Sequence, residues 1–132
     1  MSPIADMLTQ LKNAQMRGYA EVVLPFSQMK FQIAQILKNK NFVGEVEKRK
    51  RKTKKSEFDI LAIGLKYNNG VGSITDIKMV SKPSRRMYAG KKTLKPVRQS
   101  YGISVVSTSK GLMTGDDARK AGLGGEIICE VW

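Results

Sequence analysis

The spacing of apolar residues predicts a helix at the start of the chain. Four of them recur every three or four positions: Ile4, Met7, Leu8 and Leu11. Ser2 is suited to cap this helix, because Pro3 then takes the first helical position, where no backbone N–H is needed. The pattern ends near Gly18, so one face of the helix is expected to lie in the core.

A second helix is predicted after a short strand at 21–25. Ser27 is placed to cap it, and Phe26 and Phe31 are spaced to pack together across its first turn. Its expected buried face consists of Met29, Ile33, Ile36 and Leu37. Lys30 and Lys38 then face solvent.

Alternating apolar and polar residues predict strands in the rest of the first half. Two strands, at 43–47 and 58–67, flank a basic run at 48–55. Asn69–Gly70 is a typical hairpin dipeptide, and it leads to a further strand at 74–79. Two helices on one face of an antiparallel sheet make an α+β lobe over residues 1–80.

The pattern resets at Ser81–Ser84, and short strands dominate the remainder. They are predicted at 86–89, 103–107 and 126–132. A short helix precedes the last strand, capped by Thr114 and stopped by Gly122. Residues 81–132 are therefore expected to form a second small lobe, mostly β with one short helix, so the fold class is α+β.

The charge balance indicates a polyanionic partner. The 132 residues include 24 Lys and Arg against 11 Asp and Glu, which gives a formal net charge of +13. Such a surplus attracts nucleic acid or an anionic membrane. Nucleic acid is favoured and no membrane partner is expected, because no apolar run approaches the roughly 20 residues that span a bilayer and no signal peptide is evident.

The reactive residue types are scarce. The chain has one cysteine, Cys129, and no histidine, so an internal disulfide is excluded and a zinc site lacks its usual ligands. This composition suits a reducing cytoplasm. Cys129 lies in an apolar strand, which is typical of a small buried hydrophobe. We expect no metal, cofactor or catalytic residue.

A polar segment that begins at the end of the strand at 103–107 is the main candidate for binding nucleic acid. It consists of Ser107, Thr108, Ser109, Lys110 and Gly111. Hydroxyls donate and accept hydrogen bonds, and the segment has no carboxylate that would repel phosphate. Ser107 and Lys110 also match a Ser-x-x-Lys acyl-transfer motif, but its partner motifs are absent. A loop that contacts a polyanion is therefore favoured over a catalytic site.

Two other basic segments strengthen this hypothesis. All residues at 48–55 except Thr53 are Lys or Arg, which predicts a mobile hairpin tip that grips phosphates; the alternative is a solvated loop. Tyr88 lies among Arg85, Arg86 and Lys91–Lys92. Its ring is suited to stacking on a base or sugar, or alternatively to packing on the sheet. The glycines at 122–125 indicate a helix stop and a close backbone approach.

Taken together, these segments resemble the bacterial small-subunit ribosomal protein eight family. The similar segments are residues 3–9, 81–83 with 86–88, 102–114 and 118–129, so the resemblance covers nearly the whole chain. It implies a non-catalytic protein of the cytoplasmic small ribosomal subunit that binds a helix in the central domain of its ribosomal RNA, supports assembly and touches neighbouring ribosomal proteins. It also allows a second role, repression of translation through a similar hairpin in the messenger RNA of a ribosomal-protein operon.

The family's RNA contacts carry over by resemblance onto residues of both lobes. In the second lobe they fall on Ser107, Thr108, Ser109, Tyr88, Gly124 and Glu126. A supporting contact from the first lobe falls near Lys30 or Lys55. Our own interpretation of the basic segments adds Arg86 and Lys110 to the expected RNA-binding residues.

Three departures from the family pattern affect these expectations. Ser84 stands where glycine is usual, and Gly115 stands where an acidic residue often begins the short helix. The run at 48–55 is far more basic than is usual, so its partner does not transfer. The rival binding hypothesis is a basic DNA-architectural protein, which predicts little preference among duplexes rather than preference for an irregular RNA helix.

Overall fold

The computed structural model describes residues 3–82, 84–90 and 102–132. Its three helices and antiparallel strands confirm the predicted α+β class. The described chain divides into two compact units, Pro3–Ile74 and Thr75–Trp132. The lobes predicted at 1–80 and 81–132 stay a prediction about independently folding parts.

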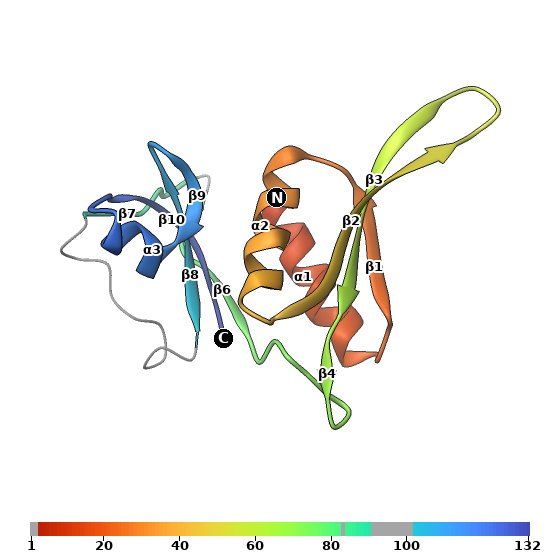
Figure 1. The fold of residues 1–132 in the computed structure, drawn as a ribbon, viewed down its shortest axis with the longest axis horizontal. Coiled ribbons are helices and arrows are strands. Elements are labelled where there is room, and N and C mark those ends of the chain that lie inside the picture. The colour runs from red at the N-terminus through yellow and green to blue at the C-terminus, as the bar shows by residue number, and fades with distance from the viewer. Residues whose placement is uncertain (1–2, 83, 91–101) are drawn as a thin grey trace. The chain divides into compact units, whose positions relative to one another are not determined.

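The N-terminal unit packs two helices on one face of a three-stranded sheet (Figure 1). The helices are α1, Pro3–Met16, and α2, Gln28–Asn39. The sheet order is β1-β3-β2, with β1 at Glu21–Pro25, β3 at Glu57–Leu65 and β2 at Val43–Lys52. Its fully buried side chains include Met7, Leu8, Leu11, Ile33, Leu37, Leu61 and Ile63, so both predicted helical stripes reach the core.

The start of α2 confirms its predicted cap. The Ser27 hydroxyl accepts a hydrogen bond from the Lys30 backbone N–H at 3.2 Å, and the Phe26 and Phe31 ring centroids are 5.7 Å apart. The prediction for Met29 is wrong, because its side chain is 41% exposed. Ala34 is buried instead, so the buried residues of α2 are Ile33, Ala34 and Leu37. The predicted cap of α1, Ser2, lies outside the described residues.

The basic run is mostly strand, which corrects the prediction of a loop at 48–55. β2 continues to Lys52, which is opposite Glu57 in β3. Only Thr53–Ser56 form the turn, where the Thr53 N–H donates to the Ser56 carbonyl at 2.7 Å. β1 pairs with β3 no further than Ile60, so the two longer strands extend past the sheet as a two-stranded arm, residues 50–59 (Figure 1).

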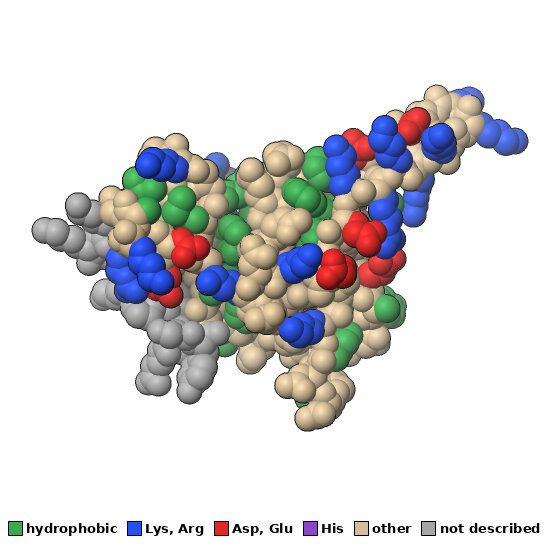
Figure 2. Space-filling model, viewed as in Figure 1, with side chains coloured by type: hydrophobic (Ala, Val, Ile, Leu, Met, Phe, Trp, Pro, Cys, Tyr) green, Lys and Arg blue, Asp and Glu red, His purple; other side chains and the backbone are tan. Residues whose placement is uncertain are grey.

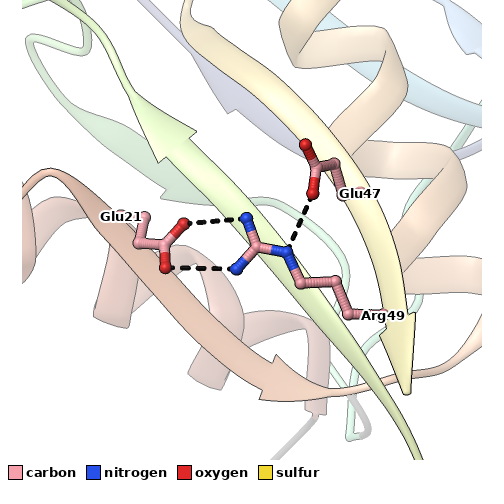
Figure 3. Close-up of polar contacts among 3 residues, drawn as sticks. All are labelled: Glu21, Glu47 and Arg49. Carbon is pink, nitrogen blue, oxygen red and sulfur yellow. Dashed lines mark hydrogen bonds and ion pairs between the residues drawn. The ribbon is translucent and has the colours of Figure 1, made fainter. Parts of the chain in front are cut away.

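Carboxylates explain how strand pairing persists through so many cations. Arg49 donates to Glu47 at 2.8 Å and lies 3.3 Å from Glu21 on β1 (Figure 3). The hydrogen bonds to Glu47 and Glu21 raise the pKa of Arg49 above its ordinary value. These counterions offset the repulsion between neighbouring cations that a run of like charges otherwise suffers.

The hairpin predicted at Asn69–Gly70 is confirmed. β4, Tyr67–Asn68, pairs with β5, Val71–Gly72. Asn69 and Gly70 have φ of 54° and 79°, the left-handed pair that a tight two-residue hairpin requires.

The C-terminal unit is a five-stranded antiparallel sheet with one short helix. Its strands are β6 at Ile77–Met79, β7 at Tyr88–Ala89, β8 at Ile103–Thr108, β9 at Gly111–Thr114 and β10 at Gly125–Val131. The order is β6-β10-β8-β9, and β7 also pairs with β10. The prediction that the strand at 74–79 belongs to the first sheet is wrong, because alternation reveals a strand but not its partner, which is β10.

Helix α3, Gly115–Lys120, confirms the predicted short helix. The Thr114 hydroxyl accepts from the Asp117 N–H at 3.1 Å, and Ala118 packs with Val106 in the core beneath it. Gly115 is buried, and a Cβ there would collide with the Ser104 hydroxyl. The missing acidic residue is therefore explained by the close approach of helix and strand.

Candidate nucleic-acid interface

Three of the residues expected to contact RNA lie side by side across the C-terminal sheet. Glu126 in β10 is directly opposite Tyr88 in β7 on one side and Ser107 in β8 on the other. Directly opposite residues in antiparallel strands point to the same face. We call Tyr88, Glu126 and Ser107 the sheet row; it presents a ring, a carboxylate and a hydroxyl in line.

The carboxylate of the sheet row has a cationic partner. Arg86 Nη1 donates to Glu126 Oε2 at 3.1 Å, and only 18% of the Glu126 side chain is exposed. A bare carboxylate would repel a phosphate, and the guanidinium offsets that charge while remaining exposed itself. Glu126 therefore orients Arg86 and keeps the ability to accept a hydrogen bond from an amino group.

Tyr88 presents its ring to solvent. The residue is 70% exposed in a two-residue edge strand. Such exposure does not fit the alternative in which the ring packs on the sheet, and it leaves an aromatic face available for stacking. Lys91–Lys92, which the sequence places near this ring, lie outside the described residues.

A buried serine that the sequence analysis missed positions Arg86 and Tyr88. The Ser81 hydroxyl accepts from the Met87 N–H at 2.9 Å and donates to the Met87 carbonyl at 3.3 Å, and that carbonyl also accepts from the Ile127 N–H at 2.9 Å. Only the position of Ser81 in the Ser-Lys-Pro joint signals this role.

The polar segment at 107–111 is a tight hairpin, so its prediction as a five-residue loop is wrong. Ser107 and Thr108 belong to β8, and Gly111, with φ of 108°, begins β9. The Thr108 hydroxyl donates to the Gly111 carbonyl at 2.8 Å and accepts from the Lys110 N–H at 3.1 Å. Thr108 therefore braces the turn, while Ser109 and Lys110 are its exposed residues.

Gly124 and Gly125 bring backbones together beside the sheet row, as the sequence predicted. A Cβ on Gly124 would lie 2.5 Å from the Ala89 carbonyl oxygen, and one on Gly125 would collide with the backbone of Ser107. Because glycine has no side chain, the backbone at the start of β10 can approach β7 on one side and β8 on the other. The two glycines therefore allow the close strand spacing beside the sheet row.

The two expected contacts from the first lobe occupy different elements of the N-terminal unit. Lys30 lies in the first turn of α2, and its ammonium donates to the Pro25 carbonyl at 2.9 Å. Lys55 lies in the turn that closes the arm. The structure does not bring these two lysines together.

Cys129 is fully buried in β10, which confirms its interpretation as a core residue. Burial, aided by the charge of Glu130, raises the pKa of the Cys129 thiol to about 12. The native protein should therefore react negligibly with iodoacetamide at a pH of about 8, where an ordinary thiol of pKa about 8.5 reacts readily. Mass spectrometry should find rapid alkylation only after denaturation; rapid alkylation of the native chain would contradict this prediction.

These features define a class of protein: a small, basic α+β chain with a surface suited to a polyanion. The sheet of its C-terminal unit presents an ion pair, hydroxyl groups and an exposed aromatic ring. Among the described residues, no helix is long and apolar enough to cross a membrane. The family model described as Ribosomal protein S8 matches residues 2–132. The chain therefore belongs to the ribosomal protein S8 family, which is not enzymatic, and the resemblance found in its motifs is confirmed.

Similar curated proteins cover the chain nearly end to end. The small ribosomal subunit protein uS8 of Caldicellulosiruptor bescii is 45% identical over 100% of this chain and 98% of its own length. The proteins of the same name from Saccharophagus degradans and Caldanaerobacter subterraneus are 46% and 47% identical, each over 98% of this chain and 96% of the relative.

Proposed function

We propose that the protein binds structured RNA of the small ribosomal subunit through the sheet row, Arg86 and the Ser109–Lys110 turn. The observation that carries this proposal is the register that aligns Tyr88, Glu126 and Ser107 on one face. A ring can stack on an unpaired base, and hydroxyls can reach a base edge or a 2′-hydroxyl. The name of its relatives, small ribosomal subunit protein, supports the same partner.

The chemistry of this surface favours one kind of RNA structure. An A-form RNA duplex offers only a shallow minor groove, so a surface that combines stacking with short polar groups favours a helix with unstacked bases. Combined with what the family resemblance implies, we infer that the target is an irregular helix in the central domain of small-subunit ribosomal RNA, bound in the cytoplasm during subunit assembly beside neighbouring ribosomal proteins. DNA lacks the 2′-hydroxyl, which disfavours the DNA-architectural alternative.

Translational repression would use the same surface. A hairpin in the messenger RNA of a ribosomal-protein operon that presents the same unstacked bases would compete with ribosomal RNA for the sheet row. We include this second role in the proposal because no separate binding site is needed for it. Competition between the two RNAs in a binding assay tests it directly.

The hydroxyls of Ser107 and Ser109 should discriminate between RNA folds. Replacing both with alanine removes polar contacts but no charge, so affinity for the ribosomal RNA hairpin should fall by about 1 to 3 kcal/mol, by analogy with base contacts. Affinity for a plain RNA duplex of equal length should hardly change. Thr108 is kept, because its hydroxyl braces the turn and its loss would confound the result. Filter binding measures both affinities.

Lys110→Gln provides the matched control on the same turn. It removes a charge, so it should weaken both RNAs alike and lower the slope of log affinity against log salt by about 0.7 to 0.9. Equal losses for both RNAs in the serine variant, with unchanged circular dichroism, would show that the hydroxyls make a generic backbone contact.

A further inference from the structure

The unpaired positive charge of the arm increases from its base towards its end. The arm is not part of the RNA-binding surface proposed on the C-terminal unit. Where the arm leaves the sheet, cations have acidic partners: Lys48, just before the arm, lies 3.6 Å from Asp59, and Lys50 lies 3.5 Å from Glu57, which is opposite Lys52. Arg49 is held between two carboxylates in the same way (Figure 3). The base of the arm is therefore close to neutral.

At the end of the arm, the described cations lack carboxylate partners. Within the part of the chain that the structure describes, four cations at this end make no ion pair: Arg51, Lys52, Lys54 and Lys55. Figure 2 shows Lys and Arg side chains along the arm as far as its end. Pairing at the base concentrates the unneutralised positive charge at the end, which suits a polyanionic ligand.

An exposed aromatic ring lies within this charged end. Phe58 is directly opposite Arg51, so the two side chains share one face of the arm. That face is opposite the one that packs on the helices, because Leu61, which pairs with the buried Leu24 of β1, is an odd number of residues from Phe58. Phe58 is 44% exposed. Phe58 is thus a half-exposed ring outside the buried core, directly opposite a guanidinium for which the described residues supply no ion pair.

We propose that Arg51 and Phe58 form a stacking platform for an unpaired nucleotide of RNA, with Lys52, Lys54 and Lys55 binding the adjoining phosphates. Aromatic rings and guanidinium planes both stack on bases, and cations that track the backbone hold the strand against them. The proposal rests on the proposed function only for the identity of the partner as RNA. The site itself is separate in sequence and composition from the sheet row.

Single-stranded RNA tests the platform without the structured target. Phe58→Leu keeps an apolar side chain and removes the ring, so affinity for a short oligouridine strand should fall by about 5- to 150-fold, as for loss of one stacked base. Affinity for an uninterrupted RNA duplex of equal length should stay within about twofold, since paired bases cannot stack on the ring. Fluorescence anisotropy of labelled RNA measures both with the full chain.

Two controls separate this site from the sheet row and from general charge. In the Ser107→Ala, Ser109→Ala background, Phe58→Leu should weaken oligouridine binding by the same factor as in the unmodified chain, even if the proposed function fails. Lys40→Gln removes an exposed cation from the same unit and should affect both probes equally. Ultraviolet crosslinking of a thiouridine strand should map to the arm.

Unchanged binding of oligouridine by Phe58→Leu would overturn the proposal, and this is also the result expected if a protein or membrane occupies the platform. An equal loss for the duplex would overturn it as well, because that would indicate a contact with the backbone alone. Circular dichroism of Phe58→Leu should match that of the unmodified protein, since Phe58 is not among the buried core residues and leucine keeps an apolar side chain there.

Discussion

Replacing Tyr88 with alanine should weaken binding of the ribosomal RNA hairpin by about 5- to 150-fold. The ring is 70% exposed on the edge of the sheet, so its loss removes a stacking surface without opening a cavity in the core. Tyr88→Phe keeps the ring and should cost little. Isothermal titration of both variants with the same RNA measures the difference.

The pair of variants separates two kinds of contact. Equal losses from Tyr88→Ala and Tyr88→Phe would identify the hydroxyl as the contact and contradict stacking. Because the side chain lies next to Glu126 and its partner Arg86, thermal unfolding of both variants should be checked alongside binding. Exposed substitutions of this kind usually change stability by less than about 0.5 kcal/mol.

Gly125→Ala should destabilise the C-terminal unit by about 1 to 3 kcal/mol, the usual cost of overpacking, and reduce binding of RNA with it. The new Cβ would collide with the backbone of Ser107 and lie 3.2 Å from the α-carbon of Thr108. Backbone cannot rotate away as a side chain can, so β10 and β8 must separate. That separation disrupts the alignment of Ser107 with Glu126.

The single tryptophan allows the unfolding of the C-terminal unit to be measured separately. Trp132 hydrogen-bonds to Thr75 and Asp76 within the C-terminal unit, so its fluorescence during urea unfolding reports on that unit. Gly44→Ala in the N-terminal unit is the control, with circular dichroism following both variants, because a Cβ there would meet nothing closer than 3.4 Å and stability should hardly change. Similar unfolding midpoints for the two variants would contradict the argument from close approach.

Local signals predicted the elements whose partners lie close by in the sequence. The caps at Ser27 and Thr114 and the Asn69–Gly70 hairpin depend on interactions within a few residues, and all are found. Non-local pairing was predicted less well. Tandem cations suggested a loop at 48–55, whereas carboxylates on neighbouring strands let β2 continue to Lys52.

The candidate site shows the same division. The polar residue types and the excess of charge pointed to RNA from composition and motif, and the family match agrees with the motifs. The pairing of Glu126 with Arg86, the exposure of Tyr88 and the brace at Thr108 came only with the fold. Ser81 was missed altogether, because burial gives its hydroxyl a role that its residue type does not reveal.

The sequence by itself determined the chemical groups that this protein can offer. It has a surplus of cations, it has hydroxyl groups but no histidine that could activate them, and it has glycines where backbones approach each other. Tertiary structure decided which of these groups act together. Strand register placed Tyr88, Glu126 and Ser107 in one row although β7, β8 and β10 are separated along the chain. The physical reason is that register depends on side-chain packing and backbone hydrogen bonds between distant segments, which no local pattern contains.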